Sequence, residues 1–386
     1  MSDKIFIIYH GRFPSEKAAA LFTAKNAEAF SDAGKDVTVL VPRRLGRNRQ
    51  SYSDYFGIQK NFKTVFLPVI DLFPISFLDK LAFITNFLTF SLSCLFFFFF
   101  KASKKDIIYS NESLPLFFIS FFFPKIVYEI HDFPKAKRFF YEILLKRIWK
   151  IVVTNHWKKT KLMQEFNIPE KKLLYESNAV DLKQFSVNLS QEDARKKLSL
   201  PQDKFILTYV GMLKTMGMEK GIDTVFSALK LLDDKFILLL IGGSQSDLDY
   251  YKKLSEKEGI KNRIIFAGFV KNSEVPIYLK ASDVLLAPFP KNDHYEFYMS
   301  PMKIFEYMAS SRPIIASDLV SIKEIAGGTA IYVPPSDKTA LAGAILGLKD
   351  NPALASEMAQ KALNQVSDHT WQKRAERIID FLYNQD

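Results

Sequence analysis

The sequence is poor in the residues that form disulfides and bind metals. It has one cysteine, Cys94, and 5 histidines among 386 residues. A single cysteine excludes a disulfide within the chain and is typical of a reducing compartment. His, Cys and Asp residues are not grouped at the spacing of a metal site, and no Asp-x-Asp pair lies in a suitable loop. We therefore expect no metal and no cofactor.

Acidic residues are scarce relative to basic ones in the first half of the chain only. Residues 1–200 carry a net charge of +12, and residues 201–386 carry −1. This asymmetry favours an anionic partner for the first half, although any one cluster is more often a solvated face. The partner could be an acidic membrane surface, a lipid-linked phosphate or a nucleic acid, but without a recognisable nucleic-acid module we expect no nucleic acid. The basic clusters are Arg43, Arg44, Arg47 and Arg49; Lys135, Lys137 and Arg138; Lys146, Arg147 and Lys150; and Lys158, Lys159 and Lys161.

One segment, residues 81–100, lacks charge and is long enough to span a bilayer. Strands of one expected sheet precede and follow it, so a single crossing would divide that sheet. We expect a buried crossover helix, with a helix partly embedded in the membrane surface as the alternative. The N-terminus has no secretory signal layout. These features predict a cytoplasmic protein that binds the cytoplasmic face of a membrane peripherally, through its basic half.

Strands and helices alternate along the chain in two successive series. Near-continuous apolar strands interleaved with helices are typical of a parallel sheet covered on both faces. A polar stretch at about residues 185–203 divides the two series. We predict an α/β fold with two Rossmann-like parallel-sheet domains, residues 1–190 and 200–369, that face each other across a cleft. The expected strands are residues 5–9, 36–41, 65–67, 107–110, 126–130 and 151–154, then 205–210, 236–241, 264–266, 284–287, 314–316 and 330–333.

Residues 300–309, SPMKIFEYMA, predict a helix whose start binds an anion. Ser300 is a suitable N-cap and Pro301 a suitable first helical residue. The first turn offers unpaired backbone N–H groups and the positive end of the helix dipole, and Lys303 adds a full charge there. Glu306 follows one turn later, where its carboxylate can accept hydrogen bonds from a ribose. The alternative is an ordinary capped helix with a solvated Lys and Glu.

The segments around this helix carry a family resemblance. Residues 281–289, ASDVLLAPF, precede it, and residues 310–318, SSRPIIASD, follow it. Together they resemble the nucleotide-sugar site of retaining glycosyltransferases of family 4, which have the GT-B fold. The chain looks like a divergent branch with an S-P-x-K-x-F-E-Y-M-A motif. The resemblance implies a UDP- or GDP-sugar as donor substrate, and a last helix, about residues 370–386, that packs back on the first domain.

The donor-binding residues are expected at strand ends and helix starts of both domains. A nucleoside diphosphate needs cations or backbone N–H groups. The residues expected to bind the diphosphate are Gly11, Arg12, Lys220, Ser300, Met302 and Lys303. For the nucleoside, the resemblance implies Gly242, Phe269, Val270 and Glu306.

Two positions depart from the family pattern. Met212 stands where the family has an arginine, directly after the first glycine of the second domain. Tyr298 stands where it has the first of two paired glutamates, of which Glu306 matches the second. The contacts to the donor sugar therefore stay open, and the candidates for them are Asp293, His294, Glu296 and Tyr298.

A His-Asp pair, residues 131–132, ends a strand of the first half. By resemblance, His131 is the family histidine near the donor sugar and acceptor, and it and Glu306 are the catalytic candidates. The alternative is a histidine that is hydrogen-bonded at a strand end. We expect Glu129 to point to the opposite face of the strand.

These features together predict a retaining, metal-independent glycosyltransferase. It would move a sugar from a nucleotide-diphosphate sugar to a lipid-linked or saccharide acceptor in surface polysaccharide or glycoconjugate synthesis. Two alternatives stay open. One is a nucleotide-sugar epimerase of the same architecture, and the other is a non-catalytic partner subunit, which the departures from the family pattern at Met212 and Tyr298 favour.

Overall fold

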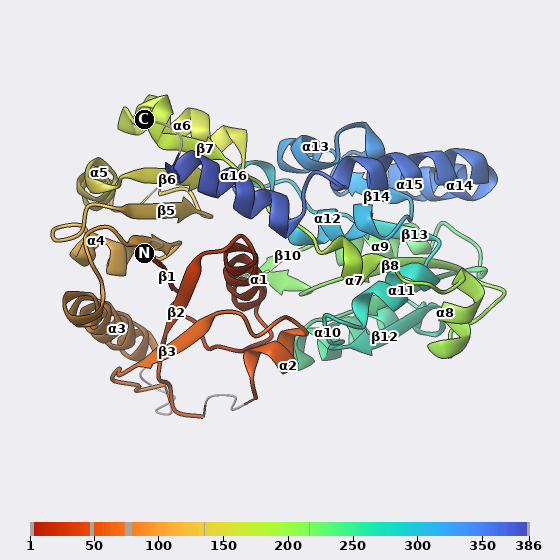
Figure 1. Cartoon of the computed structure of the whole chain (residues 1–386). Helices are drawn as coiled ribbons and strands as arrows, with labels where there is room; N and C mark the ends of the chain where they lie inside the picture. Colours follow the sequence, from red (N-terminus) through yellow and green to blue (C-terminus); the bar gives the residue numbers. More distant parts are fainter. Residues whose placement is uncertain (1–3, 47–49, 74–78, 135, 216, 384–386) are drawn as a thin grey trace. The chain divides into compact units, whose positions relative to one another are not determined.

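The structure, a computed structural model, describes residues 4–46, 50–73, 79–134, 136–215 and 217–383. Of the predicted basic clusters, Arg47, Arg49 and Lys135 lie outside these residues. The chain divides into two compact units (Figure 1). The first unit comprises Met1–Ser177 together with Trp371–Asp386, and the second comprises Asn178–Thr370.

The first unit is built on a seven-stranded sheet in the order β3-β2-β1-β4-β5-β6-β7. All neighbouring strands pair in parallel. The central strands β4, β5 and β6 are buried along their whole length, as their near-continuous apolar sequences require. The strands are β1 (Lys4–Ile8), β2 (Asp36–Pro42), β3 (Lys63–Leu67), β4 (Ile107–Ser110), β5 (Ile126–Ile130), β6 (Lys150–Val153) and β7 (Leu173–Tyr175).

Helices connect these strands, and the last helix of the chain returns to pack on α1. The first unit has α1 (Ala18–Asp32), α2 (Tyr52–Phe56), α3 (Asp79–Lys101), α4 (Ser113–Ile119), α5 (Arg138–Arg147), α6 (His156–Phe166) and α16 (Trp371–Tyr383).

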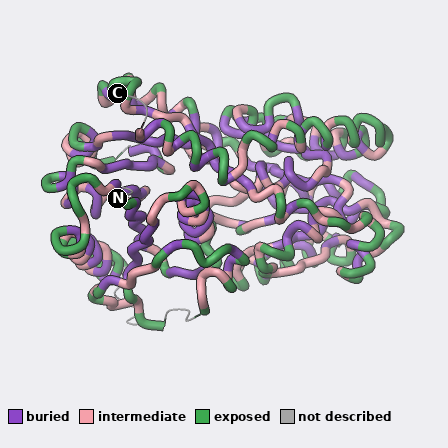
Figure 2. Tube along the Cα trace, in the orientation of Figure 1, coloured by how far each residue is buried: buried purple, intermediate pink, exposed green. Residues whose placement is uncertain are grey.

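Helix α3 connects β3 to β4, which belong to the same parallel sheet, so it is a crossover helix. Among the described residues it is the one helix long and apolar enough to cross a membrane, with a mean hydropathy of 1.9 over an 18-residue window of Lys80–Lys101. The expectation of a buried helix is correct for one face only, which carries Phe90, Cys94 and Phe98. The other face is exposed, as the green positions of Figure 2 show. Its exposed apolar residues are Leu81, Phe83, Ile84, Leu88, Leu92, Phe96, Phe99 and Phe100.

The second unit is built on a six-stranded parallel sheet in the order β12-β11-β8-β13-β14-β15. A short antiparallel hairpin, β9 (Lys214–Thr215) with β10 (Met218–Glu219), follows β8. The sheet strands are β8 (Phe205–Val210), β11 (Phe236–Ile241), β12 (Ile264–Gly268), β13 (Val284–Ala287), β14 (Ile314–Ser317) and β15 (Ile331–Val333).

Two apolar clusters, one with Leu285 and Tyr307 and one with Leu286 and Phe226, form the core of the second unit. Its helices are α7 (Leu182–Phe185), α8 (Gln191–Lys197), α9 (Ile222–Leu229), α10 (Gln245–Lys257), α11 (Val275–Ala281), α12 (Met302–Ala309), α13 (Val320–Ala326), α14 (Lys338–Asp350) and α15 (Pro352–Val366).

The predicted α/β fold class with two parallel-sheet units is confirmed. The boundary differs from the sequence analysis, which took residues 185–203 as a linker. That stretch contains α8, whose Arg195 side chain bonds the Ala281 carbonyl at 2.9 Å and Asp283 at 2.6 Å, so it belongs to the second unit. Arg195 is the buried polar residue of α8, whereas Glu192, Asp193, Lys196 and Lys197 are exposed and give the stretch its polar composition.

Candidate active site

Strand β8 lies between β11 and β13 in the sheet. Strands β11 and β12 extend the sheet on one side of β8, and β13, β14 and β15 extend it on the other. The carboxyl ends of β8 and β13 frame a switch point, where open α/β sheets bind ligands. Tyr307 of α12 joins these strands. Its hydroxyl accepts a hydrogen bond from the backbone N–H of Val210 (2.9 Å) and donates one to the carbonyl of Leu286 (3.3 Å). Helix α12 is therefore anchored to both strands at the switch point.

Glycines allow the loops at this edge to approach one another closely. A Cβ on Gly242 would lie 2.6 Å from the carbonyl oxygen of Gly211, and one on Gly221 would lie 1.7 Å from that of Pro288. A Cβ on Gly211 would lie 3.3 Å from Lys303 Nζ. The loops after β8, β11 and β13 and the starts of α9 and α12 therefore meet in one place.

Replacing Gly221 with alanine is expected to destabilise the second unit, because the new Cβ would overlap the Pro288 carbonyl and the backbone has φ +81°. Gly259→Ala is a matched control, since its φ is +72° but nothing lies within 4 Å of the added Cβ. We expect Gly221→Ala to cost about 1–3 kcal/mol more than the control. Urea unfolding followed by circular dichroism measures the difference, and equal midpoints would contradict the close approach.

Lys303 has a buried and unsatisfied ammonium group at this edge. Nζ lies 3.6 Å from the ring centroid of Tyr209 and 5.1 Å from that of Phe289, and it has no hydrogen-bond partner among the residues that the structure describes. Burial, and then the charge of Lys220, lower the pKa of Lys303 well below its usual value. Burial also lowers the pKa of Lys220 to about 8. Two desolvated cations with perturbed pKa values are typical of a site that binds an anion.

Glu306 lies one turn after Lys303 on α12 and is half-buried. Burial raises the pKa of Glu306 to about 7, although the charge of Lys303 and a hydrogen bond from the Asn272 side chain oppose this shift. A buried carboxylate gains from hydrogen-bond donors such as ribose hydroxyls. The predicted pairing of Lys303 with Glu306 on one helix face agrees with this geometry.

The predicted N-cap of α12 is wrong. The helix begins at Met302, and its N-cap is Pro301, with no side-chain cap hydrogen bond. The Ser300 hydroxyl instead accepts from the backbone N–H of Asn178 (3.4 Å), and the Ser300 carbonyl accepts from the Asn178 side chain. Ser300 therefore anchors the segment after β7, which the local helix pattern could not indicate. The first turn of α12 keeps backbone N–H groups without side-chain caps.

The candidates for the nucleoside lie at the ends of β11 and β12. The N–H of Gly242 donates to the carbonyl of Gly268 (2.6 Å), which joins the two strand ends. Phe269 follows with a 63% exposed side chain, whereas Val270 packs on the apolar core. An exposed ring beside these strand ends is suited to stacking on a base.

The donor-sugar candidates lie on a π-helical turn, His294–Tyr298, and at its N-cap, Asp293. Glu296 is buried, with 8% exposure, and within the described part of the chain its Oε2 has no hydrogen-bond partner. An unsatisfied buried carboxylate oxygen distinguishes Glu296 from Asp293, His294 and Tyr298, and it is the strongest of the four candidates.

In the first unit, Gly11 and Arg12 follow β1. A Cβ on Gly11 would lie 2.0 Å from the hydroxyl oxygen of Tyr9, so the space beside this glycine is filled by the chain itself. Arg12 is exposed. The missing side chain of Gly11 therefore leaves room for the Tyr9 side chain. A role for Gly11 or Arg12 in diphosphate binding stays a prediction.

His131 follows β5 in the same sheet and is partly exposed. Its Nε2 lies 3.1 Å from Oε1 of Glu129, and its ring meets the edge of the Phe22 ring at 4.7 Å. The expectation that Glu129 points to the opposite face is wrong, because residues two apart in a strand share a face. A charged residue in an otherwise apolar strand was the sequence signal for a buried partner.

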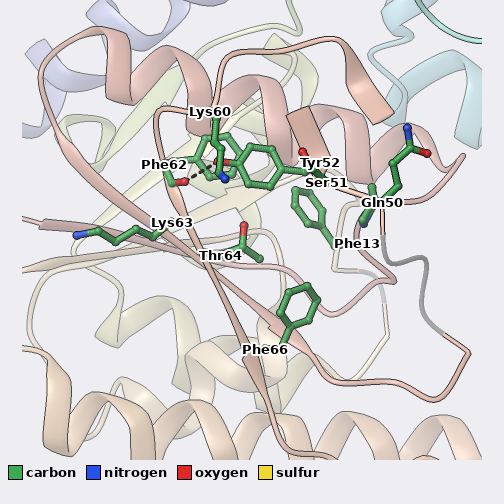
Figure 3. Close-up of a pocket in the computed structure, with 10 residues that line it drawn as sticks. Phe13, Gln50, Ser51, Tyr52, Lys60, Phe62, Lys63, Thr64 and Phe66 are labelled. Carbon is green, nitrogen blue, oxygen red and sulfur yellow. Dashed lines mark hydrogen bonds between the residues drawn. The ribbon is translucent and has the colours of Figure 1, made fainter. Parts of the chain in front are cut away.

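The first unit also contains a cavity of about 520 Å³ between α2, β3 and the loop after β1 (Figure 3). The Tyr52 and Phe62 rings stack at 4.2 Å, and the Tyr52 hydroxyl donates to the Phe62 carbonyl at 2.6 Å. Phe13 and Phe66 also line this cavity, with Lys60 among its polar residues. None of the predicted site residues lines it.

In the described part of the chain, no three His, Cys, Asp or Glu side chains are grouped as a metal site. The two parallel units, with a last helix that returns to the first, have the GT-B fold of the solved glycosyltransferases that they resemble. Residues 190–365 match the family described as Glycosyl transferases group 1. This match lies entirely within the second unit.

Three similar proteins illustrate the range of this likeness. The uncharacterized glycosyltransferase MJ1607 of Methanocaldococcus jannaschii is 24% identical over 60% of this chain and 59% of its own length. The alpha-D-kanosaminyltransferase of Streptomyces kanamyceticus is 28% identical over 42% of this chain and 40% of its own. The alignments thus span only about half the length of these relatives. The crystal structure of Anabaena HepE in complex with UDP has a TM-score of 0.75 at 16% identity, over 99% of this chain and 100% of HepE.

Proposed function

We propose that the protein is a retaining, metal-independent glycosyltransferase of the family 4 type. It transfers a sugar from a UDP- or GDP-sugar to a lipid-linked or saccharide acceptor in surface polysaccharide or glycoconjugate synthesis. The observation that carries this proposal is the unpartnered ammonium group of Lys303, which is buried beside Lys220 and Gly211 at the carboxyl edge of the second sheet. A diphosphate would supply the missing counter-charge there.

The residues take distinct roles in this reaction. Lys220, Lys303 and the N–H groups of the first turn of α12 stabilise the negative charge that develops on the leaving nucleoside diphosphate. Glu306 accepts hydrogen bonds from the ribose. By the family resemblance, His131 positions the reacting groups rather than acting as the sole base.

A panel of UDP-, GDP-, ADP- and CMP-sugars tests the proposal. A matching donor raises the melting temperature, because it binds only the folded state, and an acceptor then releases nucleoside diphosphate. Conversion of the donor to an isomer without that release would identify an epimerase. A non-catalytic subunit would bind the donor but act only in a complex with a partner chain. The activity of that complex would then be the same with the His131→Ala variant as with the unaltered protein. Absence of both a shift and turnover across the panel would overturn the proposal.

The affinity for the free nucleotide should depend on pH through Lys220. Its pKa is about 8 in the free protein, and a bound diphosphate raises it, so the charge that binds the phosphates is lost as pH rises through 8. For one such group the affinity for UDP or GDP falls about tenfold between pH 7 and pH 9. Calorimetric titration measures this slope, and Lys220→Met should flatten it. An equal slope in that variant would assign the dependence to another group.

The exposed apolar face of α3 is the proposed contact with the membrane. Phe121 and Phe122, just after α4, extend this face, since the rings of Phe99 and Phe122 meet at 5.0 Å. Arg147 of α5 lies over the Phe121 ring at 4.0 Å, which adds a cation to its edge. Apolar side chains bordered by basic ones suit the surface of an anionic leaflet. The exposed lysines near the ends of α3 are Lys80, Lys101, Lys104 and Lys105.

Arg44 is not available for that contact. Its guanidinium donates to the His10 carbonyl at 2.9 Å and lies over the Phe73 ring at 4.9 Å, so it is part of the interior of the first unit. The prediction that Arg43, Arg44, Arg47 and Arg49 jointly bind lipid therefore does not apply to Arg44.

Liposome sedimentation tests the membrane contact. Binding should require anionic lipid, weaken with salt, and fall in a variant with glutamine at Lys101, Lys104 and Lys105. The control replaces three exposed lysines of the second unit, Lys235, Lys253 and Lys257, and so removes the same charge. If both variants lose binding equally, net charge alone is responsible. If the unaltered protein does not sediment with anionic vesicles, the membrane proposal fails and the transferase proposal stands.

A further inference from the structure

A chain of hydrogen bonds connects His131 to the last helix of the protein. Glu129 lies within β5 and is fully buried. Its Oε1 accepts from His131 Nε2 at 3.1 Å and also from Nη2 of Arg374 on α16. Its Oε2 accepts from the hydroxyl of Tyr109 on β4. Three donors from three parts of the first unit thus hold one carboxylate.

Arg374 is fully buried and held on every side of its guanidinium. Nε donates to the carbonyl of Ser177 at 2.9 Å, and Nη1 donates to Oδ1 of Asn26 on α1 at 2.7 Å. Cζ lies 5.1 Å from the ring centroid of Phe22, the ring that also meets the edge of His131. The guanidinium cannot turn without losing several of these contacts, so it fixes Glu129 in place.

The ionisation of Glu129 decides which ring nitrogen of His131 remains available. Burial alone would raise the pKa of Glu129, but the charge of Arg374 and the hydrogen bonds from His131 and Tyr109 bring it to about 2. A carboxylate can only accept hydrogen bonds, so the proton between the two side chains resides on His131 Nε2. Nδ1 has no hydrogen-bond partner among the described residues and is left for a ligand.

We infer that Glu129 and Arg374 are positioning residues for His131, which hold its ring so that Nδ1 stays available to a hydroxyl group of a bound substrate. This inference rests on the proposed transferase function. Whenever the imidazole is neutral, the proton held at Nε2 leaves a lone pair at Nδ1, which accepts a hydrogen bond from that hydroxyl. The second unit ends at Thr370, and α16, which carries Arg374, begins at the next residue.

A purely structural role for the buried pair is the alternative, and α16 supplies an internal comparison. Arg377 makes two hydrogen bonds of 2.7 Å to Glu176, directly after β7. That pair also attaches α16 to the sheet, but no hydrogen bond joins Glu176 to His131 in the described residues. The two pairs differ in their connection to the histidine, which makes Arg377→Met a matched control.

The experiment is a mutant cycle on turnover. The pair is replaced together, Glu129→Met with Arg374→Met, because exchanging a buried ion pair for apolar residues often preserves folding. We expect this variant to turn over about 10- to 100-fold more slowly, with unchanged nucleotide affinity, because the histidine is misplaced. In the His131→Ala background the same replacement should cost nothing further. Arg377→Met should leave turnover unchanged.

An additive loss in the His131→Ala background would overturn the inference and assign the pair to structure alone. Proton NMR of histidine-labelled protein gives a readout that needs no activity. The Nε2–H signal of His131, identified by its absence in His131→Ala, should exchange slowly with water in the unaltered protein and rapidly in the double variant. Rapid exchange in both would also overturn the inference. An unaltered protein with a slow signal but no turnover on any donor would instead refute the proposed function.

Discussion

Lys303→Met is expected to remove most of the affinity for the donor nucleotide while leaving the protein folded and at least as stable. The ammonium group lies over the Tyr209 ring and finds no hydrogen-bond partner in the described residues, so the free protein bears the cost of burying it. A bound diphosphate offsets that cost with charged hydrogen bonds of about 1.5–3 kcal/mol. The affinity for UDP or GDP should therefore fall roughly 10- to 150-fold.

Opposite effects on binding and stability separate this role from a structural one. Lys349→Met is the control, because Lys349 lies over the ring of Phe236, the first residue of β11, at 5.3 Å and thus at the other end of the sheet. It should leave nucleotide affinity unchanged. Calorimetric titration and thermal unfolding measure the two quantities. Unchanged nucleotide affinity in Lys303→Met would remove this residue from the diphosphate site.

Arg374→Met is expected to destabilise the first unit strongly, because it leaves Glu129 buried without its counter-ion. Breaking a buried ion pair from one side costs about 3–5 kcal/mol. The three tryptophans, Trp149, Trp157 and Trp371, all lie in the first unit, so their fluorescence in urea reports its unfolding. Arg377→Met should cost less, since that side chain is 41% exposed.

The pH dependence of stability should change sign in this variant. In the unaltered protein the folded-state pKa of Glu129, about 2, lies below its unfolded value, so its contribution is present at neutral pH and is lost as pH falls toward 2. Without Arg374, burial dominates and the folded-state pKa rises above the unfolded value. Stability is then lost as pH rises through that higher pKa, and the variant should be more stable at pH 5 than at pH 8. A variant that is least stable at pH 5 would contradict the assignment of the charge to Glu129.

Local sequence patterns were sufficient for the fold class and for the helix that carries Lys303 and Glu306. The alternation of apolar strands and helices predicted both parallel sheets, because each strand is buried on two faces and reads as a continuous apolar run. Lys303 and Glu306 share a helix face by their spacing alone. These features depend on neighbours within a few residues, which is the range over which periodicity carries information.

Contacts between distant segments were beyond such patterns. The prediction of Ser300 as the N-cap of α12 was wrong because its hydroxyl accepts a hydrogen bond from the backbone N–H of Asn178, 122 residues away in the sequence. The aromatic rings around Lys303 come from β8 and from the loop after β13, and no spacing links them to α12. For α3 the sequence left two alternatives, a buried helix and one partly embedded in a membrane surface, because composition shows that a helix is apolar and does not show which side the sheet covers.

The sequence by itself therefore determined that this chain has two parallel α/β units, and it predicted an anion-binding site at the start of α12. Only the tertiary structure decided that Lys303 lacks a partner, and that Glu129 is joined to Arg374, 245 residues later in the chain. The physical reason is that burial and long-range pairing set the charge state of a side chain, and both arise only when segments far apart in the chain pack together.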